Sequence, residues 1–270
     1  MKRTSTILLM LLCVGAGALR GLDLTRYTDL SHDFIQYGPY WIRYVILALL
    51  LMEIGAVSLK LPKNSTPSTE AAPVQGGLCL LTGMGFAALS GLRLTQFGQT
   101  DSINRLLTIL FLLSGVWFLL LGYSRLSSQL ESPTYTAWMG ILGTLSLYLL
   151  TIQRFCVNPS GVVRVGSTLA SLASLAALLF AAAQAKAAYV PEKQGGRWLY
   201  FTGFAVFLLA DCLALPGAAA EFMIGQIEVA QLAEAIALAL LGLCGLAAAF
   251  AAQKRPAAEP DEPETNEKTE

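Results

Sequence analysis

Eight long apolar segments limit what this chain can fold into. Each is apolar over most of its length, and charged residues, proline or glycine flank it. A helix of about 20 apolar residues crosses the hydrocarbon core of a bilayer, and the alternating pattern of a transmembrane β-barrel is absent. The sequence therefore predicts an all-α fold, a polytopic transmembrane helical bundle of about eight helices. The segments run over residues 5–19, 40–59, 76–93, 105–123, 135–153, 165–185, 198–216 and 229–252.

The composition agrees with a membrane protein and argues against a nucleic-acid partner. Hydrophobic residues make up 55% of the chain and charged residues 13%, whereas soluble domains average about 25% charged residues. The net charge is zero, so nucleic acid would gain no electrostatic attraction. We expect the lipid bilayer to be the main partner.

The first segment has two interpretations. Met1-Lys2-Arg3, a short apolar run and Ala16-Gly17-Ala18 also fit a signal peptide cleaved after Ala18, which would leave seven helices. We favour retention, because cleavage would remove part of a stretch that recurs later. Leu11–Arg26 and Leu81–Gln96 match without gaps at 8 of 16 positions. A true repeat predicts four helical hairpins, and the alternative is convergence on the residues that tight packing requires.

The basic residues predict the orientation and the location. With the N-terminus inside, all seven lysines and four of the eleven arginines fall on the cytoplasmic side, as the positive-inside rule requires. We therefore expect a multi-pass protein of a bacterial cytoplasmic membrane with both termini in the cytoplasm. Residues 1–253 form one transmembrane domain, and residues 254–270 form a disordered acidic tail.

Small residues recur at intervals of four and predict close helix contacts. Residues four apart share a helix face, and small side chains let backbones approach closely in lipid. Such faces also suit a membrane-protein partner or a homo-oligomer. The predicted packing residues are Gly17, Gly21, Gly83, Ala87 and Gly91.

Charged residues near or inside the spanning segments are the candidate polar site. An intramembrane acid is costly without a partner, and arginines at helix ends can reach inward. One interpretation is a cavity opening outward, with Asp211 and Glu234 as cation or proton sites or with arginines binding an anion. The other is a set of interhelical salt bridges. The candidates are Glu53, Asp211, Glu234, Arg43, Arg93 and Arg154.

Signatures of catalysis and of metal binding are missing from the sequence. The chain has no GxxxxGK[ST], HExxH or GxSxG motif. Its one histidine, His32, lies between Asp29 and Asp33, a pattern more typical of a solvated turn than of a metal site. The five cysteines form no CxxC. We expect no catalytic residues, no metal and no cofactor, and an enzyme is the least favoured class.

Two function classes remain. The first is a non-enzymatic membrane module, such as a scaffold, a sensor or an assembly factor. It is favoured because prolines lie in loops or at the ends of the predicted helices, whereas transporter sites are often built on interrupted helices. The alternative is a small-solute or ion permease that uses the intramembrane acids and the outer arginines.

Overall fold

The computed structural model is almost entirely helical. It describes residues 3–29, 34–35, 38–61, 73–96, 101–127, 137–157, 164–189 and 195–253, with side chains left out at a few helix ends. The acidic tail, His32 and Asp33 lie outside the described residues. The helices are α1 (Arg3–Arg26), α2 (Tyr40–Leu59), α3 (Pro73–Leu94), α4 (Ser102–Leu126), α5 (Ala137–Val157), α6 (Val165–Tyr189), α7 (Gly196–Val206), the π-helical η3 (Phe207–Ala214), α8 (Leu215–Met223) and α9 (Val229–Ala251).

These elements make eight spans long and apolar enough to cross a membrane, because α7, η3 and α8 join into the single span Gly196–Met223. The predicted all-α polytopic bundle is confirmed. A short antiparallel pair of strands, β1 (Thr28–Asp29) and β2 (Phe34–Ile35), follows α1.

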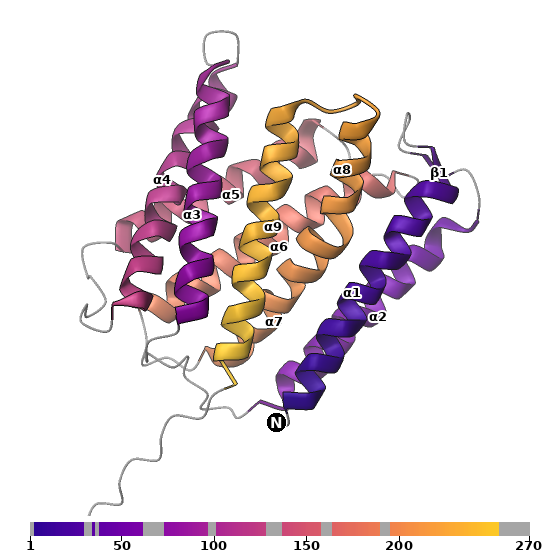
Figure 1. Cartoon of the computed structure of the whole chain (residues 1–270), viewed down its shortest axis with the longest axis horizontal. Coiled ribbons are helices and arrows are strands. Elements are labelled where there is room, and N and C mark those ends of the chain that lie inside the picture. The colour runs from indigo at the N-terminus through magenta and orange to yellow at the C-terminus, as the bar shows by residue number, and fades with distance from the viewer. Residues whose placement is uncertain are drawn as a thin grey trace, which may run out of the picture.

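Consecutive helices run up and down through the bundle (Figure 1). The end that carries the start of α1 and the end of α9, at the bottom of Figure 1, is called the terminal end here. The opposite end, where α9 begins, is called the Glu234 end. Helix α9 packs on both α3 and α7, and α3 packs on α4. Stacked aromatic rings fill the α3–α4 contact, with Phe86 centred 5.7 Å from Phe111 and 6.0 Å from Phe118.

Helices α1 and α2 stand beside the other helices and contact each other little (Figure 1). Helix α1 packs mainly on η3, and α2 packs mainly on α7. At the terminal end, the hydroxyl groups of Thr6 and Tyr200 lie 3.2 Å apart, and Gln253 donates a hydrogen bond to Thr6. These hydrogen bonds connect the start of α1 to α7 and to the residues that follow α9.

Helix α1 is longer than the predicted segment. The sequence predicted a loop from Arg20 to Pro39, but the helix continues to Arg26. Arg20 donates to Asp23 one turn later at 2.7 Å, and the Thr25 hydroxyl donates to the Leu22 carbonyl at 3.0 Å. Side chains three residues apart are neighbours on a helix, so this local pairing supports the extra turns.

The small residues predicted to pack have different surroundings in the structure. A Cβ on Gly83 would meet the Gly115 carbonyl oxygen at 2.8 Å, and a Cβ on Gly115 would meet the Ala87 nitrogen at 3.1 Å, so α3 and α4 approach closely here. A Cβ on Gly17 would meet the Cys212 carbonyl oxygen at 3.0 Å. Gly21 and Gly91 differ from the prediction, because no atom of a neighbouring helix lies within 4 Å of where their Cβ would be. Gly91 faces outward, while the adjacent Ser90 bonds to the Thr108 carbonyl of α4 at 2.9 Å.

The seventh span contains a wide turn that the sequence interpretation missed. We placed the end of this segment at Pro216, but the helix continues to Met223. Proline lacks an N–H and its ring clashes with the carbonyl of the preceding turn in a regular α-helix. In η3 the turn is widened, and the Leu215 N–H bonds to the Ala210 carbonyl five residues back. Pro216 therefore lies within a spanning segment, and the sequence argument that placed every proline at a helix end is wrong at this position.

Candidate functional site

Three of the candidate charges meet near the Glu234 end. Glu234 lies in the second turn of α9, Arg93 in the last turn of α3 and Arg154 in the last turn of α5. Both arginines form ion pairs with Glu234, Arg93 with Oε2 and Arg154 with Oε1 at 2.6 Å. The three side chains are nearly buried. We call them the Glu234 cluster.

Further contacts hold the two guanidinium groups in place. Arg154 also donates to the carbonyl oxygen of Ala170 on α6. Arg93 lies over the ring of Phe111 on α4, 5.1 Å from its centre, an arrangement that favours a cation. The Nε of Arg93 is buried and has no hydrogen-bond partner in the described part of the chain. The cluster thus connects α3, α4, α5, α6 and α9, and the Nε–H of Arg93 has no acceptor among the described residues.

The start of α9 positions Glu234. Glu228 and Gln231 form a capping box, in which the side chain of each bonds to the backbone N–H of the other, with the Glu228 N–H at 3.0 Å from Gln231 Oε1. Such a box satisfies two of the N–H groups that a helix start leaves unpaired. Glu234 follows less than two turns later, so its carboxylate lies close to the helix start.

A cavity of about 240 Å³ borders the Glu234 cluster. Ligand pockets commonly measure about 300–1,000 Å³, so this cavity suits a molecule smaller than a typical drug. Its charged lining residues are two arginines and two glutamates, a balanced set. Among its polar lining residues are Arg93, Gln153, Arg154, Ser167, Ser171, Glu221, Gln231 and Glu234.

Asp211 lies apart from the Glu234 cluster. It belongs to η3, and its neighbours Ala210 and Ala214 line the cavity, whereas Asp211 itself does not. Its carboxylate packs against α9 at Gly242, where a Cβ would overlap the oxygen. The Oδ2 atom is buried and bonds to no other described group. The predicted pairing of Asp211 with an outer arginine is therefore not seen.

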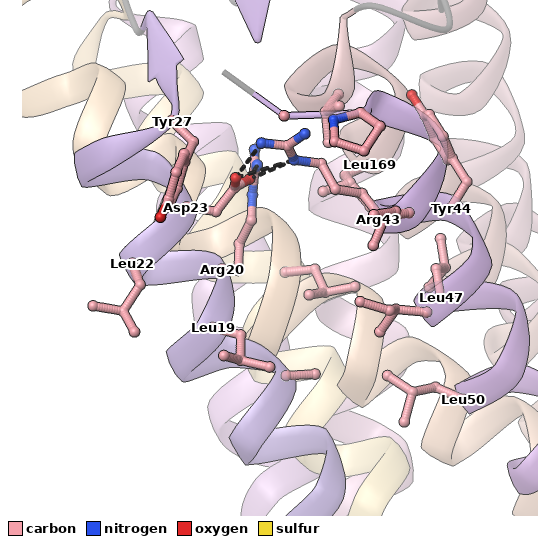
Figure 2. A pocket seen from close by; sticks show the side chains of 17 residues that line it. Leu19, Arg20, Leu22, Asp23, Tyr27, Arg43, Tyr44, Leu47, Leu50 and Leu169 are labelled. Atoms are coloured by element: carbon pink, nitrogen blue, oxygen red, sulfur yellow. Dashed lines mark hydrogen bonds and ion pairs between the residues drawn. The ribbon is translucent and has the colours of Figure 1, made fainter. Parts of the chain in front are cut away.

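Arg43 belongs to a second charged cluster, which we call the Asp23 cluster. Both Arg20 and Arg43 donate to the Asp23 carboxylate: Arg20 Nη1 at 2.7 Å and Arg43 Nε at 3.0 Å (Figure 2). Arg43, on α2, therefore pairs with a carboxylate of α1 and with neither Asp211 nor Glu234 in the described part of the chain. The sequence interpretation assigned Asp23 to a loop and missed its role. The available signal was the spacing of three between Arg20 and Asp23.

Glu53 joins neither cluster. Its side chain is exposed on α2, between the exposed Met52 and the buried Ile54. No hydrogen bond or ion pair connects it to the residues that the structure describes. The six candidate residues therefore divide into one convergent group of three, one residue of a separate cluster and two isolated acids.

The fold and these sites define a multi-pass integral membrane protein with two charged clusters near one end of its helical bundle. Comparisons with family models, with curated proteins and with solved structures give no match for the chain. Its function is therefore argued from the geometry of the sites.

Proposed function

We propose that the protein is a non-enzymatic membrane module of the sensor type, which binds a small polar solute in the cavity beside Glu234. The observation that carries this proposal is the meeting of Arg93, Arg154 and Glu234 at the wall of one cavity. Helix contacts alone do not require a cavity. Buried charges that converge on a cavity with both apolar and polar lining residues are typical of ligand sites.

The lining favours a solute with both charges or with several hydrogen-bonding groups. Two arginines and two glutamates line the cavity, so a ligand of one sign would face repulsion from half of them. The Arg93 Nε is an unused donor, and a buried donor without a partner costs free energy. A small zwitterion with a carboxylate for the arginines and an ammonium group for the glutamates meets these conditions.

The cavity faces the outer side of the membrane in this proposal. Among the described lysines, Lys60 follows the end of α2 and Lys186 lies in the last turn of α6, both at the terminal end, which the positive-inside rule places in the cytoplasm. The Glu234 end then lies in the outer leaflet. A solute reaches the cavity from outside, and the chain reports its binding to a partner in the membrane.

A pair of matched variants tests the binding site without touching the charges. Ala218 lines the cavity, whereas the neighbouring Ala219 does not. Purified protein in nanodiscs is titrated with zwitterionic, anionic and cationic amino acids by calorimetry. We expect the wild type and Ala219→Phe to bind a zwitterion and Ala218→Phe to lose at least tenfold in affinity. Equal affinity in the two variants, or no binding of any solute by the wild type, contradicts the proposal.

A permease is the second candidate, and Asp211 favours it. Wide π-helical turns occur often at functional sites. Here the turn lies on the segment that forms the cavity wall, and it carries a buried carboxylate oxygen that has no partner among the described residues. A permease that moves a proton with its solute needs such a group. Uptake of the solute into proteoliposomes distinguishes the two functions. Saturable uptake that Asp211→Asn abolishes, while the variant still binds the solute, establishes transport. Binding without uptake establishes the sensor.

A further inference from the structure

A second cavity separates helices α1 and α2 near the Glu234 end. Its volume is about 470 Å³. Leucines of α1 and α2 form its walls, and Val165, Leu169 and Leu213 of α6 and η3 also line it (Figure 2). The space exists because α1 packs on η3 while α2 packs on α7, so the two helices touch only slightly. We call this cavity the α1–α2 groove.

The groove is apolar along its length and charged at one end. Figure 2 shows Leu19 and Leu22 of α1 on one side and Leu47 and Leu50 of α2 on the other, with the Asp23 cluster above them. From Arg43 to Leu50 the helix rises about 10 Å, at 1.5 Å per residue. That is most of one leaflet, since the hydrocarbon core of a bilayer is about 30 Å thick. The groove therefore has the shape of a site for an extended hydrocarbon chain with a polar head.

The Asp23 cluster itself carries a net positive charge, because two guanidinium groups share one carboxylate. Arg20 is only 6% exposed, and its buried Nε has no hydrogen-bond partner in the part of the chain that the structure describes. Asp23 holds both groups in fixed positions. A held guanidinium with an unused donor suits a phosphate, which accepts hydrogen bonds from a planar pair of N–H groups.

Aromatic residues place this end at the level of lipid headgroups. Tyr40 and Trp41 begin α2 and are 45% and 56% exposed. Exposed tyrosine and tryptophan side chains concentrate at membrane–water interfaces. The guanidinium groups of the cluster therefore lie at the depth of lipid phosphates, with the apolar groove below them.

We propose that the α1–α2 groove binds an anionic phospholipid, with one acyl chain between α1 and α2 and the phosphate on Arg20 and Arg43. The apolar walls accommodate the acyl chain. The net positive charge of the Asp23 cluster favours an anionic lipid over a zwitterionic one, because it repels the ammonium group of the zwitterionic headgroup. The bound lipid fills the space between two helices that pack poorly on each other. This site is separate from the cavity beside Glu234 and does not depend on the function proposed for it.

The test measures retained lipid on the full-length protein by native mass spectrometry. Protein in detergent is equilibrated with equal amounts of dioleoyl phosphatidylglycerol and dioleoyl phosphatidylcholine. We expect one phosphatidylglycerol to be retained in preference. Arg43→Gln should lower this preference about tenfold, the loss of a charge-assisted hydrogen bond. Arg26→Gln is the control, because it removes the same charge from an exposed position that does not line the groove.

A second pair of variants leaves all charges in place, so it remains informative if Arg43→Gln fails to fold. Ile46 lines the groove and Val45 does not, and the two are similarly exposed, at 43% and 45%. We expect Ile46→Trp to fill the groove and to reduce retention of both lipids severalfold, whereas Val45→Trp retains lipid as the wild type does.

Three results would overturn the proposal. The first is equal retention of the two lipids by the wild type. The second is loss of the lipid when millimolar glycerol phosphate is added, which would show that a soluble phosphate and not a lipid occupies the site. The third is a dimer whose formation Ile46→Trp abolishes, which would show that a second copy of the chain occupies the groove.

Discussion

The Asp23 cluster and the Glu234 cluster have the same chemical composition and different surroundings. Each consists of two arginines that share one carboxylate. The Asp23 cluster joins two poorly packed helices above an apolar groove. The Glu234 cluster joins α3, α5 and α9 beside a cavity with both polar and apolar lining residues, and α4 and α6 add a ring and a carbonyl group.

The residues that pack around a charged cluster therefore determine how much it contributes to stability and which ligand it suits. Removing one partner of a buried ion pair leaves a charge that water cannot reach, and the cost rises with burial. The Glu234 cluster should therefore be a structural centre as well as a binding site, whereas the Asp23 cluster should act locally. Four substitutions test this contrast.

The largest effect is expected for Glu234→Gln. The amide cannot neutralise Arg93 and Arg154, so two nearly buried cations lose their shared partner. Loss of one partner from a buried pair costs about 3–5 kcal/mol. The free energy of unfolding is measured by SDS titration in mixed micelles and followed by circular dichroism. A loss below that of Asp23→Asn would reverse the comparison between the two clusters.

A smaller effect is expected for Asp23→Asn. Its carboxylate is nearer the surface, since Asp23 is 16% exposed and Glu234 is 9% exposed, and a hydrogen bond to a charged group contributes about 2 kcal/mol. We expect a loss of about that size. Hydrogen exchange should rise at the end of α1 and the start of α2 and should stay unchanged in α9. Faster exchange in α9 would show that the cluster is not local.

Arg154→Lys tests the geometry of the Glu234 cluster at constant charge. Arg154 donates two N–H groups to Glu234 and one to the Ala170 carbonyl, and an ammonium group cannot reproduce this fork. We expect a loss of about 1 kcal/mol in unfolding free energy and weaker solute binding. Arg105→Lys, at the same end of the bundle but outside both cavity linings, is the matched control. Equal losses of unfolding free energy in Arg154→Lys and Arg105→Lys would rule out a specific role for the three N–H donors of Arg154.

Glu53→Gln should have the smallest effect. Glu53 lies on the outward face of α2 and contacts no cation among the described residues, so the substitution breaks no ion pair, and changes that disturb no such contact commonly alter stability by less than about 0.5 kcal/mol. The same titration measures it, and it also serves as the control for Glu234→Gln, since both change an intramembrane glutamate to glutamine. A loss above 1 kcal/mol would indicate a partner that binds the exposed face of α2.

The sequence alone located most of the spans, because each span must carry its own apolar length to cross lipid. It left their number at seven or eight, because the short first segment also fits a signal peptide. Its local spacing was also enough to suggest that α3 has a close-packed face at Gly83 and Ala87, since a helix repeats its faces every three to four residues. It did not show that α1 continues to Arg26, because a polar helical turn beyond the bilayer has the same composition as a loop. The wide turn around Pro216 was missed for a similar reason, since a proline predicts an interruption and not how the backbone accommodates it.

Only the tertiary structure decided which charges meet. Arg93 and Glu234 are 141 residues apart, and Arg154 and Glu234 are 80 apart. No local spacing encodes such a pairing, because it depends on which helices are neighbours and how each is rotated. The same is true of Asp211, which faces Gly242 and no arginine, and of Glu53, which points away from the bundle. The sequence placed each charge at a depth along its own helix, and packing between helices determined its partners.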